Sequence, residues 1–348
     1  MSDFNAFNKF KGLLHREHFE NINSGNFLPP YCVCTDPSNM CNQNCVYCNS
    51  NQYRRKSPGV MTKKHLLNLA SFYKDWRIQS TIIEGGGEPL INTNTMCFID
   101  QCQMYDIEVG IITNGVLINK SMFNSLSGIR FIGISFDASN KKTYKAIRGT
   151  DDFNAVVGNV TELNKHKKSV DVNLKMLIQE HNYTEIYDFA KLAKEMGCNG
   201  AHIKPVAYEN LPIKKYDLSQ HTKEINEGIL KAKELESNTF EVHAVMYKFG
   251  DTLEHKVKFN KCTSTPIGGV FGADGNFWLC YNMRGINGFK LGSHNPDPYN
   301  IKRLWGGNYH KSLINDIDIG KCMRCGLTGY NEISENCIKQ DKLFWKFL

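Results

Sequence analysis

Three cysteines lie within eight residues near the start of the chain, at Cys41, Cys45 and Cys48. An aromatic residue directly precedes the third of them. Structural zinc sites and ordinary iron–sulfur clusters take four protein ligands, so this C-x3-C-x2-C loop is one thiolate short. Cys32 or Cys34 can complete a zinc site. Alternatively, the three thiolates hold a [4Fe–4S] cluster whose fourth iron stays open for a substrate or a cofactor.

The composition is that of a globular protein without a secretion signal. The chain has 348 residues, of which 41% are hydrophobic and 22% charged, so it can bury a sizeable core. No apolar run is long enough to span a membrane, and the N-terminus lacks a signal-peptide core, so we expect a cytoplasmic protein. In that compartment, 13 cysteines indicate metal or cluster ligation rather than disulfides. The net charge of +7 suits an anionic small molecule but is too weak to indicate nucleic-acid binding.

From residue 31 onward, strand and helix patterns alternate. Six apolar or β-branched runs predict strands: Tyr31–Thr35, Ser80–Glu84, Glu108–Thr113, Arg130–Phe136, Val170–Ile178 and Gly200–Val206. Five stretches between them have helical periodicity: Thr62–Trp76, Thr95–Tyr105, Lys120–Leu126, Phe153–His166 and Thr184–Met196. Repeated β-then-α units predict a parallel sheet, whose functional residues are expected at the C-terminal ends of the strands.

Four further motifs follow the predicted strands in order. The second strand leads into Glu84-Gly-Gly-Gly-Glu-Pro-Leu, the third into Thr113-Asn-Gly and the fourth into Ser135-Phe-Asp-Ala. Arg148 then stands in Ile147-Arg-Gly. Together with the cysteine loop, these motifs resemble those of the radical S-adenosylmethionine (radical SAM) superfamily, over roughly residues 31–210. The resemblance implies an α/β fold, a curved and open (β/α)6 barrel.

The resemblance also implies how the cofactors are bound. The [4Fe–4S] cluster on Cys41, Cys45 and Cys48 would bind S-adenosylmethionine and cleave it reductively to a 5′-deoxyadenosyl radical. A flavodoxin- or ferredoxin-like protein would supply the electron. Cofactor-binding roles fall on Gly86, Gly87, Glu88, Pro89, Asn114, Ser135 and Arg148. An ordinary tight turn is the alternative interpretation of the glycine run.

A second group of cysteines lies in the C-terminal quarter, at Cys262, Cys280, Cys322 and Cys325. Their order resembles the SPASM/twitch extension of radical SAM enzymes, whose full form has seven cysteines. Only Cys337 follows here. The resemblance therefore implies the shorter form, with one auxiliary [4Fe–4S] cluster on these four thiolates, as in the 2-deoxy-scyllo-inosamine dehydrogenase type. A four-cysteine zinc ribbon is the alternative, since Zn²⁺ accepts the same ligands.

These patterns divide the chain into four regions. We expect an N-terminal helical extension at 1–30, the radical SAM core at 31–210, a linker and helix at 211–255 and the auxiliary-cluster domain at 256–348. Helical periodicity predicts helices at Phe7–Phe19 and Thr222–Glu236, and Asp274-Gly275 between apolar runs predicts a hairpin.

Two reactions are consistent with this reading. After hydrogen abstraction, the auxiliary cluster accepts an electron and the substrate is dehydrogenated, or the Cys337 thiol returns a hydrogen atom and the substrate is epimerised.

Because 40 residues before Cys41 leave no room for the leader-binding module of many peptide-modifying relatives, we expect a small, sugar- or cyclitol-like substrate. Candidate contacts are His202, Lys204 and Tyr208. The alternatives are modification of a ribosomally made peptide and, in another class, a zinc-binding interaction protein.

Overall fold

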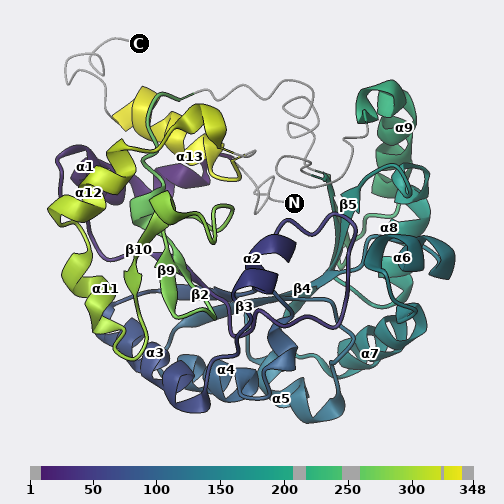
Figure 1. Cartoon of the computed structure of the whole chain (residues 1–348). Coiled ribbons are helices and arrows are strands. Elements are labelled where there is room, and N and C mark those ends of the chain that lie inside the picture. Colours follow the sequence, from purple (N-terminus) through teal and green to yellow (C-terminus); the bar gives the residue numbers. More distant parts are fainter. Residues whose placement is uncertain (1–8, 207–216, 245–258, 323–324, 339–348) are drawn as a thin grey trace.

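The computed structural model describes residues 9–206, 217–244, 259–322 and 325–338. The described part is built on one ten-stranded sheet (Figure 1). Seven of its strands run parallel in chain order: β1 (Cys32–Thr35), β2 (Ser80–Ile83), β3 (Glu108–Thr113), β4 (Phe131–Ser135), β5 (Asp171–Ile178), β6 (Gly200–Pro205) and β7 (Glu241–Ala244). Helices cover the outer face of this curved sheet, so the predicted partial barrel is confirmed.

The six predicted strands are all present. The sequence did not predict β7, which lies in the region expected to be a linker and a helix. This strand has four residues, of which only Val242 is buried, so it has no apolar run that a sequence pattern can detect.

The predicted helices are present as well. Their bounds are α3 (Lys63–Trp76), α4 (Thr95–Met104), α5 (Phe123–Ser127), α7 (Phe153–His166), α8 (Ile186–Glu195) and α9 (Thr222–Lys233). The Thr62 hydroxyl caps α3 by accepting from the amide of His65 at 3.2 Å. In the barrel, α2 (Asn51–Lys56) and α6 (Lys141–Arg148) were not predicted, and neither were the C-terminal helices α11, α12 and α13, whose bounds are given below. The Asn140 side chain caps α6, and Gly149 ends it with φ of 72°.

The C-terminal region continues the same sheet. The predicted hairpin is present as β8 (Val270–Phe271) and β9 (Asn276–Trp278), and β10 (Lys290–Ser293) pairs with β9. Because β8 is hydrogen-bonded in parallel to β1, the strands that follow Cys262 extend the barrel sheet directly. This pairing brings the second group of cysteines beside the first strand of the barrel.

The two ends of the described chain pack together. Figure 1 shows α1 (Arg16–Asn23) beside the C-terminal helices α12 (Asn308–Asn315) and α13 (Thr328–Ile333). The remaining elements are η1 (Lys9–His15), η2 (Pro89–Ile91), η3 (Lys120–Met122), η4 (Tyr183–Glu185), η5 (Leu218–His221), η6 (Thr265–Ile267), η7 (Asn287–Phe289), α11 (Tyr299–Leu304), η8 (Ile319–Lys321) and η9 (Ser334–Ile338). The helix expected at Phe7–Phe19 begins outside the described residues and continues as η1 and α1. Within the described ranges, no helix combines the length and the apolarity needed to cross a membrane.

Alternation along the strands separates the core from the barrel interior. On β1, Val33 and Thr35 are fully buried against the helices, and the Thr35 hydroxyl lies 2.8 Å from the hydroxyl of Tyr73 on α3. Cys32 and Cys34 occupy the intervening positions and line a cavity inside the barrel. The cysteines of β1 therefore lie on the interior face of the sheet, whereas Val33 and Thr35 pack in the core against the helices.

Candidate functional site

The cysteine loop leaves the C-terminal end of β1, where functional residues were expected. Cys41, Cys45 and Cys48 are partly exposed, and the amide of Cys48 donates to the carbonyl of Cys45 at 3.2 Å. Burial raises the pKa of the Cys41 and Cys48 thiols, and the neighbouring Cys45 sulfur raises both further. Binding of an iron cluster would favour the deprotonated, thiolate form of these cysteines.

Helix α6 supports this loop from the side. The amides of Asn44 and Val46 donate to the carbonyls of Arg148 and Ile147, at 3.1 and 3.0 Å. A Cβ on Gly149 would lie 2.9 Å from the carbonyl oxygen of Asn44, so a side chain at that position would push the loop away. Helix α6, which was not predicted from the sequence, thus fixes the backbone on both sides of Cys45.

Arg148 lies beside the cysteine sulfur. Its guanidinium is buried, with Nη1 3.5 Å from Cys45 Sγ and Nη2 2.7 Å from Asp137 Oδ2 in an ion pair. The hydroxyl of Tyr47 also donates to Asp137, which has a φ of 67°. Arg148 therefore supplies positive charge at a predicted cluster ligand. Its proposed contact with S-adenosylmethionine remains a prediction.

The glycine run packs tightly against the start of the cysteine loop. A Cβ on Gly87 would lie 2.1 Å from the carbonyl oxygen of Met40, and one on Gly86 would lie 2.5 Å from the side-chain oxygen of Asn39. The amide of Gly87 donates to the carbonyl of Ser38 at 3.1 Å. The glycines at these two positions are therefore needed for close contact between two loops of the protein itself.

Glu88 joins the loops that follow β2 and β3. Its buried carboxylate accepts from the Thr113 hydroxyl at 2.6 Å and from the amides of Asn114 and Leu90 at 2.8 and 3.0 Å. Burial raises the pKa of Glu88, whereas these hydrogen bonds lower it. An ionised carboxylate accepts about four hydrogen bonds, so one acceptor position is left for a ligand cation such as the S-adenosylmethionine ammonium.

The other predicted cofactor contacts lie around these loops. The Asn114 side-chain amide donates to the side-chain oxygen of Asn42 in the cysteine loop, at 2.7 Å. Pro89 is buried at the start of η2, and Ser135 ends β4 with its side chain partly exposed. The structure thus brings the predicted residues to one end of the barrel, and their contacts with a cofactor remain predictions.

Arg284 is a site residue that the sequence did not reveal. It follows Cys280 in the C-terminal region, and its guanidinium contacts Asp36 Oδ2 at 2.8 Å and Glu84 Oε1 at 2.7 Å. Burial raises the pKa of Asp36 to about 6, against the lowering effect of Arg284. Burial also acts to raise the pKa of Glu84, but Arg284 brings it below its ordinary value. These carboxylates directly precede the two cofactor loops, so Arg284 ties the C-terminal region to both.

The second group of cysteines comes together beside the barrel. Cys262, Cys280, Cys322 and Cys325 influence one another electrostatically, although they come from three separate segments. Burial and this proximity raise the pKa to about 11 for Cys280 and Cys322 and to about 12 for Cys325. Such a group of partly buried thiols has the donor atoms that would suit a cationic ligand.

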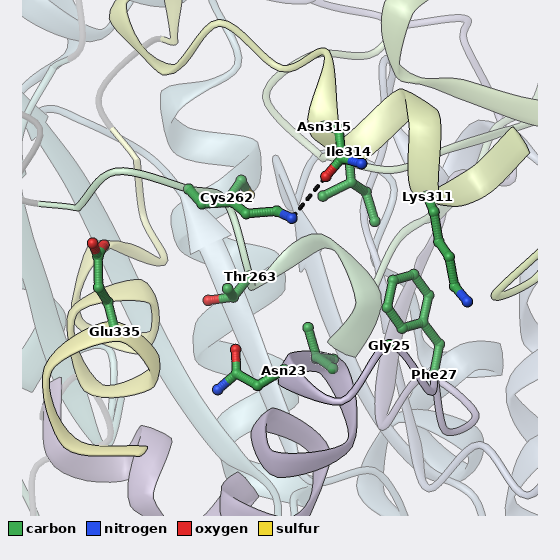
Figure 2. Close-up of a pocket in the computed structure, with 11 residues that line it drawn as sticks. Asn23, Gly25, Phe27, Cys262, Thr263, Lys311, Ile314, Asn315 and Glu335 are labelled. Atoms are coloured by element: carbon green, nitrogen blue, oxygen red, sulfur yellow. Dashed lines mark hydrogen bonds between the residues drawn. The ribbon is translucent and has the colours of Figure 1, made fainter. Parts of the chain in front are cut away.

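Two cavities meet at Cys262. An inner cavity of about 440 Å³ is lined by Cys262, Cys280, Cys325 and the β1 residues Cys32 and Cys34. An outer pocket of about 240 Å³ opens at the surface (Figure 2). Among the residues lining the outer pocket are Asn23, Phe27, Lys261, Thr263, Asn315 and Glu335. Cys262 therefore lies between the two cavities.

The remaining predicted residues lie elsewhere. Cys337 is exposed on η9, which packs near α1, and Tyr208 lies outside the described residues. His202 and Lys204 lie on β6 with partly exposed side chains. Among the described residues, no three His, Cys, Asp or Glu side chains converge closely enough to hold a single metal ion. The ligand roles of both cysteine groups rest on the sequence motifs and remain predictions.

Residues 35–193, a little under half of the chain, match the radical SAM superfamily model. A probable GTP 3′,8-cyclase from Saccharolobus islandicus is 24% identical over 219 residues, which are 60% of this chain and 68% of that protein. These matches support a radical SAM enzyme, a class whose cofactors are S-adenosylmethionine and a [4Fe–4S] cluster.

Solved structures extend the likeness to the C-terminal region. Streptococcus suis SuiB is 19% identical, with a TM-score of 0.64 over 99% of this chain and 83% of that chain. The radical SAM enzyme anSMEcpe is 18% identical, with a TM-score of 0.62 over 82% of this chain and 83% of that chain. At such identities the likeness shows the fold alone, which includes a C-terminal region resembling that of SPASM enzymes.

Proposed function

We propose that this radical SAM enzyme dehydrogenates a small polar, sugar- or cyclitol-like substrate and holds one auxiliary [4Fe–4S] cluster on Cys262, Cys280, Cys322 and Cys325. The inner cavity is the observation that carries the proposal. Three of these cysteines share its wall with Cys34 of β1, so the second cysteine group faces the barrel interior. An electron acceptor bound there would lie close to a substrate held inside the barrel.

When bound, the two clusters and S-adenosylmethionine supply a 5′-deoxyadenosyl radical and a one-electron acceptor. With those groups bound, the substrate would lose one hydrogen atom, one proton and one electron, and a cluster held by Cys262, Cys280, Cys322 and Cys325 would supply the electron acceptor. These losses sum to two hydrogens, so the product is lighter by two mass units. The chain's own residues position the substrate and keep water from the reacting carbon.

Tyr281 lines the same cavity as Cys280, Cys325 and Cys34. Burial raises the pKa of its hydroxyl, and Cys325, Cys280, Glu84 and Cys34 raise it further. In the proposed reaction its ring would help to exclude water between the second cysteine group and the barrel interior.

The position of Cys337 favours dehydrogenation over epimerisation. A thiol that quenches a substrate radical has to lie within a few ångströms of it, inside the barrel. Cys337 is instead exposed on η9. We therefore expect Cys337→Ala to keep its full iron content and its activity, whereas an epimerase using this thiol would lose the entry of solvent deuterium into its product.

A peptide is the alternative substrate. SuiB has been crystallised with its precursor peptide SuiA, and anSMEcpe with peptides. Both proteins share the fold of this chain, and the polar interior of a barrel can accommodate an extended peptide as well as a sugar. Incubation of the enzyme with both classes of candidate substrate distinguishes between them.

The deciding experiment is anaerobic incubation of the reconstituted enzyme with reductant, S-adenosylmethionine and panels of sugars, cyclitols and peptides. Loss of two hydrogens from a small molecule, detected by mass spectrometry, supports the proposal. The same loss from a peptide alone replaces it with the alternative. Iron and sulfide are measured in parallel. A protein that binds zinc and no iron would be the zinc-binding interaction protein that the sequence also allowed.

A further inference from the structure

Helix α2 begins three residues after Cys48 and carries two adjacent arginines, Arg54 and Arg55. The amide of Asn51, its first residue, donates to the carbonyl of Cys48 at 3.3 Å. Because successive residues of an α-helix point about 100° apart, the two arginines take different directions. Arg54 is partly buried, whereas Arg55 is exposed.

Tyr53 fixes the orientation of this short helix. Its side chain is buried, and its ring is nearly perpendicular to that of Trp278 on β9, with the ring centroids 6.0 Å apart. A Cβ on Gly86 would lie 3.1 Å from the tyrosine ring, and a Cβ on Gly285 would lie 2.8 Å from it. Rotation of α2 about its axis would therefore drive the ring into one of these two loops.

In this orientation the Arg54 guanidinium faces the cysteine loop. Its Nη2 donates to the carbonyl of Gln43, which lies between Cys41 and Cys45, at 3.4 Å. Its Nε–H is buried and has no hydrogen-bond partner among the described residues. Buried donors in proteins normally have an acceptor, so this donor indicates a bound group that supplies one. The sulfur atoms of an iron–sulfur cluster accept such hydrogen bonds.

The positive charge of Arg54 acts mainly at Cys48. Burial and the Cys45 sulfur raise the pKa of Cys48, and Arg54 is the first of the groups that lower it. At Cys41, burial raises the pKa most, and the raising effect of Glu88 exceeds the lowering effect of Arg54. Arg54 therefore favours the thiolate of Cys48 in particular.

Arg148 is a second guanidinium at this loop, in a different setting. It lies beside Cys45 and forms an ion pair with the buried Asp137 at 2.7 Å. Within the described ranges, Arg54 forms no ion pair with a carboxylate. Removal of the Arg54 charge thus leaves no buried acid without its partner, so its effect at the loop can be measured by itself.

We propose that Arg54 is a positioning residue that holds a positive charge beside Cys48 and thereby makes a [4Fe–4S] cluster on the cysteine loop easier to reduce. The inference rests on this loop holding the cluster, and it is independent of the substrate. A nearby cation favours the state that carries the added electron, because that state is the more negative one.

The test is an anaerobic redox titration of the reconstituted enzyme, followed by electron paramagnetic resonance. The signal that changes when S-adenosylmethionine is added identifies the cluster of the cysteine loop. In Arg54→Gln the equilibrium constant for reduction should fall roughly tenfold, which places the one-electron potential ~59 mV lower. Arg54→Lys, which keeps the charge, should retain most of the wild-type potential. Arg55→Gln is the matched control and should leave the potential unchanged, because Arg55 is exposed.

An unchanged potential in Arg54→Gln overturns the proposal, and so does an equal shift in Arg55→Gln. A potential in Arg54→Lys as low as that in Arg54→Gln also contradicts it, because the charge would then have no effect. If Arg54→Gln does not retain its iron, Tyr53→Leu replaces it as the test. This variant keeps both arginines and removes the ring that orients α2, so its potential should also fall, and an unchanged potential overturns the proposal.

The potential is measured without substrate. The proposed dehydrogenation can therefore fail while the role of Arg54 is confirmed, and the role of Arg54 can fail in an enzyme that dehydrogenates its substrate.

Discussion

Arg284 Nε lies 2.8 Å from Asp36 Oδ2, and this buried ion pair joins residues that are 248 positions apart in the chain. Asp36 stands between β1 and the cysteine loop, and Arg284 follows Cys280. The pair therefore fixes the distance between the two predicted cluster sites. Because both side chains are buried, water cannot replace either partner at low cost.

We expect Arg284→Met to destabilise the protein by about 3–5 kcal/mol, since it leaves Asp36 and Glu84 buried without their cation. The free energy of unfolding in denaturant measures this loss. Arg303→Met is the matched control, because the Arg303–Asp297 pair is exposed, with side-chain exposures of 61% and 50%. It should cost about 1 kcal/mol or less. Equal losses in the two variants would mean that the buried ion pair contributes no more stability than the exposed one.

This pair also shows what could not be predicted from the sequence. The strands and helices of the barrel were predicted because each has an apolar period that depends only on nearby residues. The partner of Arg284 depends on how the chain folds back, and no local pattern encodes a contact over 248 positions. Strand β7 was missed for another reason, because Val242 is the one buried residue among its four.

The motifs located the site better than they assigned its contacts. The cysteine loop, Glu88, Asn114 and Arg148 do come together at one end of the barrel. The family resemblance implies that these residues contact a cofactor. In this chain Glu88 and Asn114 also bind neighbouring loops, and Arg148 lies beside Cys45. Helix α6, which positions Arg148, had a sequence signal in Asn140 and Gly149 that would have revealed it.

Replacing Cys41, Cys45 and Cys48 together by Ala should abolish formation of 5′-deoxyadenosine. Roughly half of the iron should remain, because the proposed auxiliary cluster would be held by four other cysteines. Iron analysis and chromatography of the reaction products measure the two quantities. Continued cleavage of S-adenosylmethionine by this variant would refute the assignment of the cysteine loop.

Glu88→Gln should weaken S-adenosylmethionine binding by roughly tenfold to a hundredfold, because a neutral amide cannot make a charge-assisted bond to the ammonium. The side-chain size is kept, so both clusters should stay intact, and equilibrium binding measures the affinity. Glu162, a partly exposed carboxylate on α7 that pairs with Lys120, provides the control as Glu162→Gln. Unchanged affinity in Glu88→Gln would leave the carboxylate as a link between loops alone.

Arg148→Gln should make the radical SAM cluster harder to reduce. The substitution removes a positive charge 3.5 Å from Cys45 Sγ and leaves the Asp137 carboxylate without its partner, and both changes disfavour an added electron. Anaerobic redox titration followed by electron paramagnetic resonance measures the potential, which should become more negative. Lys145→Gln, on the same helix but exposed, should leave it unchanged. A shift of equal size in both variants would mean that the loss of any positive charge lowers the potential, and that the contact with Cys45 has no particular effect.

The last prediction concerns acid stability and the buried pair His65–His294. His294 Nε2 donates to the carbonyl of Gly272 at 3.0 Å, so its Nδ1 accepts from His65 Nε2 at 2.8 Å, and both rings are neutral. Burial lowers the pKa of His294 to about 3, whereas an unfolded histidine titrates near 6.5. Below pH 6.5 the unfolded chain therefore binds a proton that the folded chain refuses, and stability falls by about 1.4 kcal/mol per pH unit for this residue. In His294→Gln the slope of unfolding free energy between pH 6.5 and 5 should decrease by about that amount. If His294→Gln keeps the wild-type slope, the pair does not set the acid sensitivity of the fold.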